Sequence, residues 1–148
     1  MRIVAIDPGA SGGIAVVWPT GEVTCEPMPA TDKDLLLRLR LIFGGSPVEH
    51  RVVFLEKVHA GPKMGSSAAF KFGRQLGAIA MAVLAVGARL EWVTPQKWRR
   101  ELGLIVSGRG LGQGDTAKKN RNKARAQELF PQQRVTHATA DCLLIAEY

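Results

Sequence analysis

Two apolar runs of strand length constrain the fold of this chain more than any other feature. The first is RIVAI, from Arg2 to Ile6, and the second is RVVFLE, from Arg51 to Glu56. In neither run do apolar residues alternate with polar ones, as they would in a strand with one face in water. We therefore expect both runs to be buried strands that lie parallel and adjacent in one sheet.

The rest of the chain alternates between strand and helix patterns. This order predicts an α/β fold in which a mixed sheet carries helices on both faces. Turn residues 19–21 separate two further strands, and Thr31 followed by Asp34 is typical of a helix N-cap. The other predicted elements are strands from Gly13 and Gly21, a helix from Thr31 to Gly44, a helix from Ser67 to Val86, a strand from Arg89, a helix from Pro95 with Thr94 as N-cap, a basic helix from Asp115 or Thr116 to about Phe130, and a last helix from near Thr136.

The composition is that of one globular domain. Of the 148 residues, 46% are hydrophobic and 22% charged, so we expect a single domain over residues 1–148. The apolar stretch from Leu76 to Ala88 is shorter than the about 20 residues that cross a bilayer, and Asp7 interrupts the apolar start. We therefore expect no membrane association and no signal peptide. Cys25 and Cys142 lack the spacing of a zinc site or disulfide framework, which suits a reducing cytoplasm.

The net charge of +7 is concentrated in one segment. Between Thr94 and Arg125 the chain has nine basic and two acidic residues, which accounts for the whole excess. A one-sided basic segment is typical of a surface that binds a polyanion such as nucleic acid. A solvated helix face with spare lysines is the alternative. The candidate binding residues in this segment are Lys97, Arg99, Arg100, Arg109, Lys118, Lys119, Arg121 and Lys123.

Acidic residues end both buried runs, Asp7 after the first and Glu56 in the second. In parallel neighbours, both carboxylates lie at the sheet edge where open α/β sheets form a ligand crevice. Carboxylates held side by side repel unless a cation lies between them, and oxygen ligands favour Mg²⁺ or Mn²⁺ over Zn²⁺. The small residues from Ala10 to Gly13 would leave room for a phosphate backbone near such ions. Taken alone, Asp7 before a Pro-Gly turn is equally consistent with an ordinary turn residue.

The last predicted helix supplies a third acid, Asp141. It follows the small residues 138–140 and shares a helix face with His137, one turn earlier. Taken alone, Asp141 is equally consistent with an acid that complements the helix dipole, and His137 with a solvated histidine. Three acids converging from three separate elements favour a metal site.

Six short motifs occur in one order along nearly the whole chain. They are IVAIDPGASGG, VVFLEKVHA, FKFGRQLG, VTPQKWRREL, KKNRNKARAQELFP and HATADCLLIAEY. Together they resemble the RuvC-type Holliday junction resolvases, most closely the phage-encoded branch. The resemblance implies an RNase H-like fold with a mixed five-stranded sheet, and phosphodiester hydrolysis that depends on magnesium, for which manganese would substitute. It also implies a homodimer that makes paired nicks in a four-way DNA junction, in a bacterial or phage-infected cytoplasm.

The resemblance assigns roles to individual residues. Asp7 matches the family's first-strand aspartate, Glu56 the fourth-strand glutamate and Asp141 the last-helix aspartate. The family usually has a fourth ligand where this chain has Ala138, and His137 is the nearest substitute. In the implied two-metal mechanism, Asp7 bridges both ions while Glu56 and Asp141 hold one each. His137 is then either a ligand or a general base.

The resemblance also suggests contacts to DNA. His59 stands three residues after Glu56, where bacterial relatives tend to carry an aromatic residue that stacks on an unpaired base. An imidazole ring can stack as well, although an ordinary loop histidine is an equal alternative. The lysines expected to hold phosphates near the scissile bond are Lys97, Lys118 and Lys119.

Small residues mark the helix predicted from Ser67 to Val86. Gly73 and Gly77 lie one turn apart, and such residues let another backbone approach closely. Tight packing in the core of the same chain is the explanation we favour for them. We also expect this helix to lie at or near the dimer interface.

Several other functions compete with a junction nuclease. The glycine-rich stretch from Gly108 to Gly114 lacks both nucleotide-binding spacings, so we expect no nucleotide cofactor. DPGASGG also resembles the phosphate loop of actin-like sugar kinases, but those need two such domains. Two rivals remain: an RNase H-like nuclease on RNA or other branched DNA, and a catalytically silent nucleic-acid-binding module. Three retained acids argue against silence, because clustered carboxylates are costly without a neutralising metal.

Overall fold

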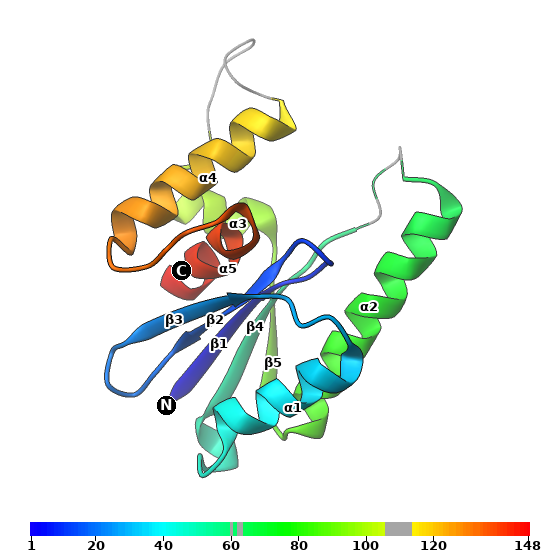
Figure 1. Ribbon diagram of the computed structural model, residues 1–148, viewed down its shortest axis with the longest axis vertical. Coiled ribbons are helices and arrows are strands. Elements are labelled where there is room, and N and C mark those ends of the chain that lie inside the picture. The colour runs from blue at the N-terminus through cyan, green and yellow to red at the C-terminus, as the bar shows by residue number, and fades with distance from the viewer. Residues whose placement is uncertain (60, 62–63, 106–113) are drawn as a thin grey trace.

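A mixed sheet forms the centre of the molecule in the computed structural model, which describes residues 1–59, 61, 64–105 and 114–148. Within these residues the sheet has five strands in the order β3-β2-β1-β4-β5 (Figure 1). The strands are β1 (Arg2–Asp7), β2 (Gly13–Val17), β3 (Val23–Pro27), β4 (Arg51–Glu56) and β5 (Arg89–Val93). The helices are α1 (Asp32–Phe43), the 3-10 helix η1 (Val48–His50), α2 (Ser66–Ala85), α3 (Pro95–Glu101), α4 (Asp115–Leu129) and α5 (His137–Glu147).

The two apolar runs are the central strands, as predicted. β1 lies parallel to β4, with Ile6 opposite Leu55, and β5 continues the parallel part of the sheet beyond β4. β2 and β3 add an antiparallel edge on the other side of β1. Ala5 and Ile6 of β1, and Leu55 and Glu56 of β4, are consecutive residues that point to opposite faces, and all four are buried, which confirms that both runs are covered on both faces.

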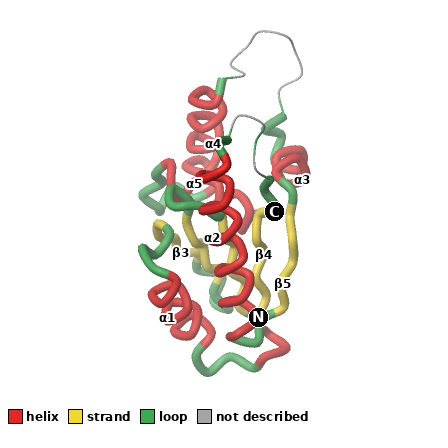
Figure 2. Tube along the Cα trace, turned by 90° about the vertical axis from the view of Figure 1, so that its right-hand side faces the viewer, coloured by secondary structure: helices red, strands yellow, loops and turns green. Residues whose placement is uncertain are grey.

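Helices cover both faces of the sheet, which confirms the predicted mixed architecture (Figures 1 and 2). α1 and α2 lie on one face, where alternate strand residues such as Val4 and Ile6 enter the first core cluster. α5 lies on the other face, with α4 against it, and here Ala5 and Ala15 enter a second cluster around Trp98. Because side chains alternate along a strand, β1 and β2 present Val4, Ile6 and Ile14 to α1 and α2, and Ala5 and Ala15 to α5.

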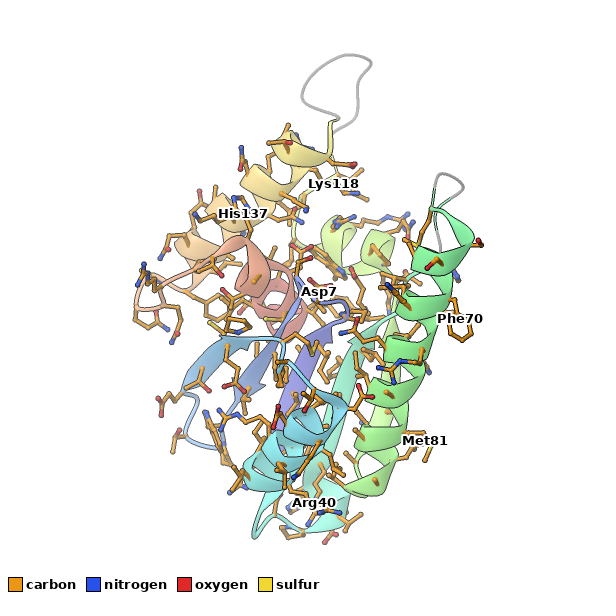
Figure 3. The ribbon with its side chains drawn as sticks, turned by 45° about the vertical axis from the view of Figure 1, so that its right-hand side comes forward. Asp7, Arg40, Phe70, Met81, Lys118 and His137 are labelled. Atoms are coloured by element: carbon orange, nitrogen blue, oxygen red, sulfur yellow. The ribbon has the colours of Figure 1, made fainter. Side chains whose placement is uncertain are left out.

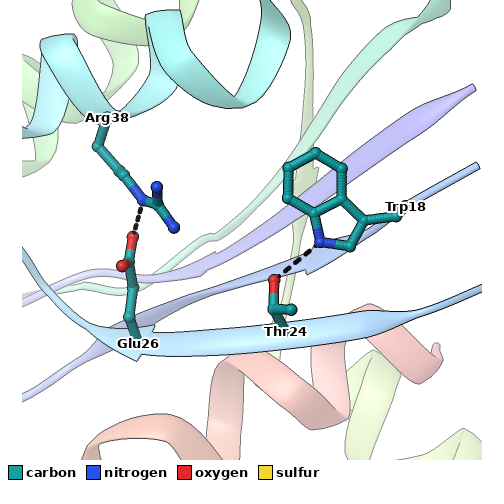
Figure 4. Close-up of polar contacts among 4 residues, drawn as sticks. All are labelled: Trp18, Thr24, Glu26 and Arg38. Atoms are coloured by element: carbon teal, nitrogen blue, oxygen red, sulfur yellow. Dashed lines mark hydrogen bonds and ion pairs between the residues drawn. The ribbon is translucent and has the colours of Figure 1, made fainter.

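The strand β3 is tied to the rest of its face by polar contacts (Figure 4). Arg38 of α1 forms an ion pair with Glu26, and the indole nitrogen of Trp18 donates a 2.9 Å hydrogen bond to Thr24 Oγ1. These contacts lie between partly buried groups at the edge of the sheet. The ion pair joins α1 to the antiparallel hairpin, and the indole hydrogen bond lies within the hairpin itself.

Helix starts match the sequence signals in most cases. Thr31 caps α1, accepting a 3.1 Å hydrogen bond from the amide of Asp34, as predicted. Thr136 precedes α5, and its amide donates a 3.0 Å bond to Thr139 Oγ1 in a reciprocal capping arrangement. Thr94 occupies the predicted N-cap position of α3 without a capping bond from its side chain.

Only one face of α2 packs against the core. Ile79 and Val83 are buried, whereas Phe70 and Met81 are 76% and 62% exposed, respectively. By length and composition α2 is apolar enough to cross a membrane, a test that single helices of water-soluble proteins also pass. A Cβ atom added at Gly73, like one at Gly77, would meet nothing within 4 Å. The prediction that these glycines serve tight core packing is therefore wrong.

Candidate functional site

Asp7, Glu56 and Asp141 come together at the carboxyl ends of the two central strands. Asp7 ends β1 and Glu56 ends β4, and strand alternation turns both side chains toward the α5 face, as it does Ala5 and Phe54. Their carboxyl groups are close enough to share a side-chain hydrogen bond. Asp141, in the second turn of α5, is near enough to act electrostatically on both.

Protonation of the site reflects this crowding. Burial, the neighbouring Glu56 and the neighbouring Asp141 together raise the pKa of Asp7 to about 8. Burial also raises the pKa of Glu56, although its hydrogen bond from Trp98 opposes that rise. In the absence of a cation, the centre therefore retains a proton near neutral pH.

Trp98 fixes the orientation of Glu56. Its indole Nε1 donates a 2.9 Å hydrogen bond to Glu56 Oε1, and both side chains are buried. Trp98 lies on α3, 42 positions after Glu56 in the sequence. The sequence analysis missed the role of Trp98, for which the one available signal was a tryptophan inside an otherwise basic helix.

Asn122 and Arg99 both contact the carboxyl group of Asp141. Asn122 Nδ2 donates a 2.8 Å hydrogen bond to Asp141 Oδ1, and a terminal guanidinium nitrogen of Arg99 lies 3.7 Å from Asp141 Oδ2. Asn122 is 2% exposed and lies on α4, so the basic helix is anchored to the site by a buried amide. The sequence analysis missed Asn122, since one asparagine in a polar helix carries no distinguishing signal.

Glycines at the β1–β2 turn let these elements approach one another. A Cβ at Gly12 would lie 2.1 Å from the carbonyl oxygen of Asp7, and one at Gly13 would lie 2.5 Å from that of Ala138 in α5. We predicted that the small residues here make room for a phosphate backbone. At Gly12 and Gly13 that prediction is wrong, because the protein's own backbone fills the space.

The donor set suits a hard divalent cation in its chemistry and its charge. Three carboxyl groups supply oxygen ligands, and burial together with the neighbouring Glu56 and Asp141 raises the pKa of Asp7, an effect that a bound cation would oppose. Among the described residues, however, no three His, Cys, Asp or Glu side chains are grouped closely enough to hold one ion together. Asp141 is instead engaged by Asn122 and Arg99.

His137 does not join this cluster. It is the first residue of α5 and is exposed, and its side chain makes no hydrogen bond or ion pair with another described residue. Figure 3 labels Asp7 near the middle of the molecule, with His137 and Lys118 above it and Arg40 at the lower end. A role for His137 as ligand or base stays a prediction.

The predicted polyanion-binding residues occupy different environments. Arg99 faces the carboxylates, whereas Arg100 is exposed, and Lys97 Nζ lies 5.2 Å from the ring centroid of Tyr148. Arg109 lies outside the described residues. On α4, Lys119 is exposed and Lys118, Arg121 and Lys123 are partly buried.

His59 is one of the residues that line a small cavity. The cavity has a volume of about 260 Å³ and is lined by Lys57, Val58, His59, Leu76 and Trp92. His59 is exposed, and Trp92 on the edge strand β5 is 46% exposed. The cavity therefore combines ring surfaces with one basic side chain.

Comparison with known proteins identifies relatives by fold alone. No family model and no curated protein sequence matches the chain. The structure of Thermus thermophilus RuvC in complex with a Holliday junction substrate matches with a TM-score of 0.62 and 18% identity, over 99% of this chain and 90% of that chain. A second Thermus thermophilus RuvC structure matches with a TM-score of 0.60 and 20% identity, over 99% and 91% of the two chains. The chain thus has the RNase H-like fold of the RuvC structures, as the sequence motifs predict.

Proposed function

We propose that this chain is a divalent-metal-dependent endonuclease that resolves four-way DNA junctions. The observation that carries the proposal is the meeting of Asp7, Glu56 and Asp141 at the ends of the parallel strands. Its fold is that of a RuvC structure determined with a Holliday junction substrate. Clustered carboxylates of this kind are costly to a protein that never binds a cation.

Asp7, Glu56 and Asp141 would hold the metal, with Asp7 between the other two. Two divalent ions, when bound, would supply a hydroxide near neutral pH and stabilise the leaving 3′ oxygen. Trp98 keeps Glu56 aimed at the site, and Asn122 does the same for Asp141. His137 would act as a further ligand or as a base that carries the proton away from the attacking water.

The DNA would lie across the end of the molecule that carries these acids. Lys118 lies on α4, the helix whose Asn122 binds Asp141, and Lys119 and Arg100 offer exposed charges on α4 and α3. Phosphate contacts from these side chains would position the backbone, and their contribution would fall as salt rises. The ring of His59 would meet a base released at the junction centre.

Paired nicks require two copies of the site, so we propose a homodimer in the cytoplasm. α2 offers an unpartnered face where Phe70, Met81 and Leu84 are exposed and Gly77 leaves open space beside them. Small residues at such a position let a second helix approach closely. A size-exclusion elution volume of a 16 kDa monomer at micromolar concentration would contradict this assignment.

A comparison of substrates tests the proposed activity. A synthetic four-way junction, a linear duplex and an RNA–DNA hybrid are each incubated with the protein and Mg²⁺. We expect symmetrical nicks in the junction, and no cutting when EDTA replaces the metal.

The same experiment separates the alternatives. Cleavage of the hybrid alone would favour an RNase H-like enzyme on RNA, and cleavage of other branched DNA a broader nuclease. Binding of the junction without cleavage would favour a catalytically silent module.

A further inference from the structure

The side chain of Arg99 is turned into the carboxylate centre rather than toward solvent. Its side chain is 17% exposed, and its terminal nitrogen forms an ion pair with Asp141. Arg100, the next residue of the same helix, is exposed. Two adjacent arginines of α3 therefore have different environments, although the sequence makes them equivalent members of a basic run.

Packing keeps Arg99 in this position. Its guanidinium carbon lies 4.7 Å from the ring centroid of Trp98, the residue whose indole binds Glu56. A cation over an aromatic face is held by the ring's negative electrostatic potential. Through this adjacent pair, α3 contacts two of the three carboxylates from one side.

The hydrogen bonding of Arg99 is incomplete. Its Nε is buried and has no hydrogen-bond partner among the described residues. The 3.7 Å separation from Asp141 is that of an ion pair without a hydrogen bond. A guanidinium normally uses its five donors in fixed, forked geometry, so this contact is a loose electrostatic one that a stronger partner can replace.

The charge of Arg99 acts on the whole centre. It opposes the effects of burial and of neighbouring acids on the pKa of Asp7, and it opposes burial at Glu56. The arginine is thus a partial neutraliser of the same negative charge that a divalent ion would neutralise.

We propose that Arg99 is the resident counter-ion of the metal-free carboxylate centre and that a divalent cation displaces it from Asp141. The proposal rests on the proposed metal-dependent function. Arg99 is a positioning residue here: it holds the acids together until the metal enters. Released from Asp141, its guanidinium is free to bind a DNA phosphate.

A pair of matched variants tests this role without measuring cleavage. Arg99→Met removes the charge and keeps a flexible apolar stem over Trp98, and Arg100→Met is the control one residue away. Metal-free full-length proteins are titrated calorimetrically with Mn²⁺, and their melting temperatures are compared. We expect Arg99→Met to melt lower than wild type without metal and to bind Mn²⁺ roughly tenfold more tightly, since a competing cation is gone. Arg100→Met should match wild type in both.

The results separate this proposal from the proposed function. Unchanged or weaker Mn²⁺ binding by a folded Arg99→Met protein would overturn displacement even if the wild type cuts junctions. Failure of both proteins to bind Mn²⁺ would overturn the metal-dependent function and the displacement with it.

A measurement on the wild type covers the case in which Arg99→Met does not fold. The Nε–H resonance of Arg99 is assigned by its loss in Arg99→Lys, which keeps the charge. Mg²⁺ should shift this resonance more than those of exposed arginines such as Arg100. An Arg99 signal that does not move when Mg²⁺ binds would overturn the proposal.

Discussion

The two faces of the sheet are built for different tasks. On the α1–α2 face, β1 and β2 present Val4, Ile6 and Ile14 to a purely apolar core. On the α5 face the same strands present Ala5, Ala15 and Gly13, and α5 approaches so closely that a Cβ at Gly13 would strike its backbone. Large side chains make the first face stable, and small ones on the second bring Asp141 to Asp7.

The hydrogen bonds that hold the acidic residues also lie on the α5 face. The bonds from Trp98 and Asn122 to the acids lie on the α5 side, where α3, α4 and α5 meet the strand ends. Buried polar groups are tolerated there because they are paired with one another. Damage to the α5 face should therefore affect activity and stability together, and damage to the α2 side should affect stability or assembly alone.

Asp7→Asn should give the largest effect. Loss of the central carboxylate is expected to reduce Mg²⁺-dependent junction cutting by about a thousandfold or more while junction binding persists. The metal-free protein should melt higher, because a neutral amide removes the repulsion that raises the pKa of Asp7. Cleavage assays, gel shifts and thermal melts measure the three quantities. Joint loss of binding and cutting would mark Asp7 as a structural residue.

Matched glycine substitutions compare the two faces directly. Gly13→Ala places a methyl group 2.5 Å from the Ala138 carbonyl oxygen and should cost about 2–3 kcal/mol of unfolding free energy, with reduced cutting. Gly77→Ala enters open space on α2 and should stabilise the chain by about 0.5–1 kcal/mol. Urea denaturation measures both. Equal effects at the two positions would remove the distinction between the faces.

Asn122→Ala tests the anchor between α4 and the acids. It removes the amide that donates to Asp141, and we expect a loss of about 1–2 kcal/mol of stability together with slower cutting. Asn120→Ala is the control, since Asn120 is exposed on the same helix. A cutting rate unchanged in Asn122→Ala would show that α4 serves DNA binding without positioning Asp141.

The pH dependence of stability tests the raised pKa of Asp7. Because the pKa of Asp7 rises from 3.8 to about 8 on folding, the folded state binds more protons between these values. Stability of the metal-free protein should therefore fall as pH rises through this range, by about 1.4 kcal/mol per pH unit where the difference is one proton. Melts of wild type and Asp7→Asn isolate the contribution, and identical slopes would contradict it.

Sequence reasoning located the parts of the site that local patterns encode. Continuous apolar runs identified β1 and β4, and their terminal acids Asp7 and Glu56 followed from strand parity and parallel pairing. Asp141 was reached through the motif at the start of α5. These features depend on residues close together in the sequence, or on the pairing of β1 with β4 alone, and can therefore be predicted from sequence patterns.

The contacts that could not be predicted from the sequence join segments that are far apart along the chain. Trp98 and Glu56 are 42 positions apart, and Asn122 and Asp141 are 19 apart, so no local period relates them. The glycines make the same point: Gly13 is tightly packed and Gly77 is open, the reverse of what we expected for the two pairs. A small residue indicates that close approach is allowed, and only the fold decides whether anything approaches.

The position of α5 in the chain has a consequence for the timing of synthesis. The α1–α2 core uses buried residues up to Ala88 and can form on the ribosome before the helices α3, α4 and α5 emerge. Asp141 arrives only when α5 reaches the sheet, after Trp98 and Asn122 are already made. A nascent chain therefore lacks the third acid, and the proposed nuclease cannot cut DNA until its last described helix has docked.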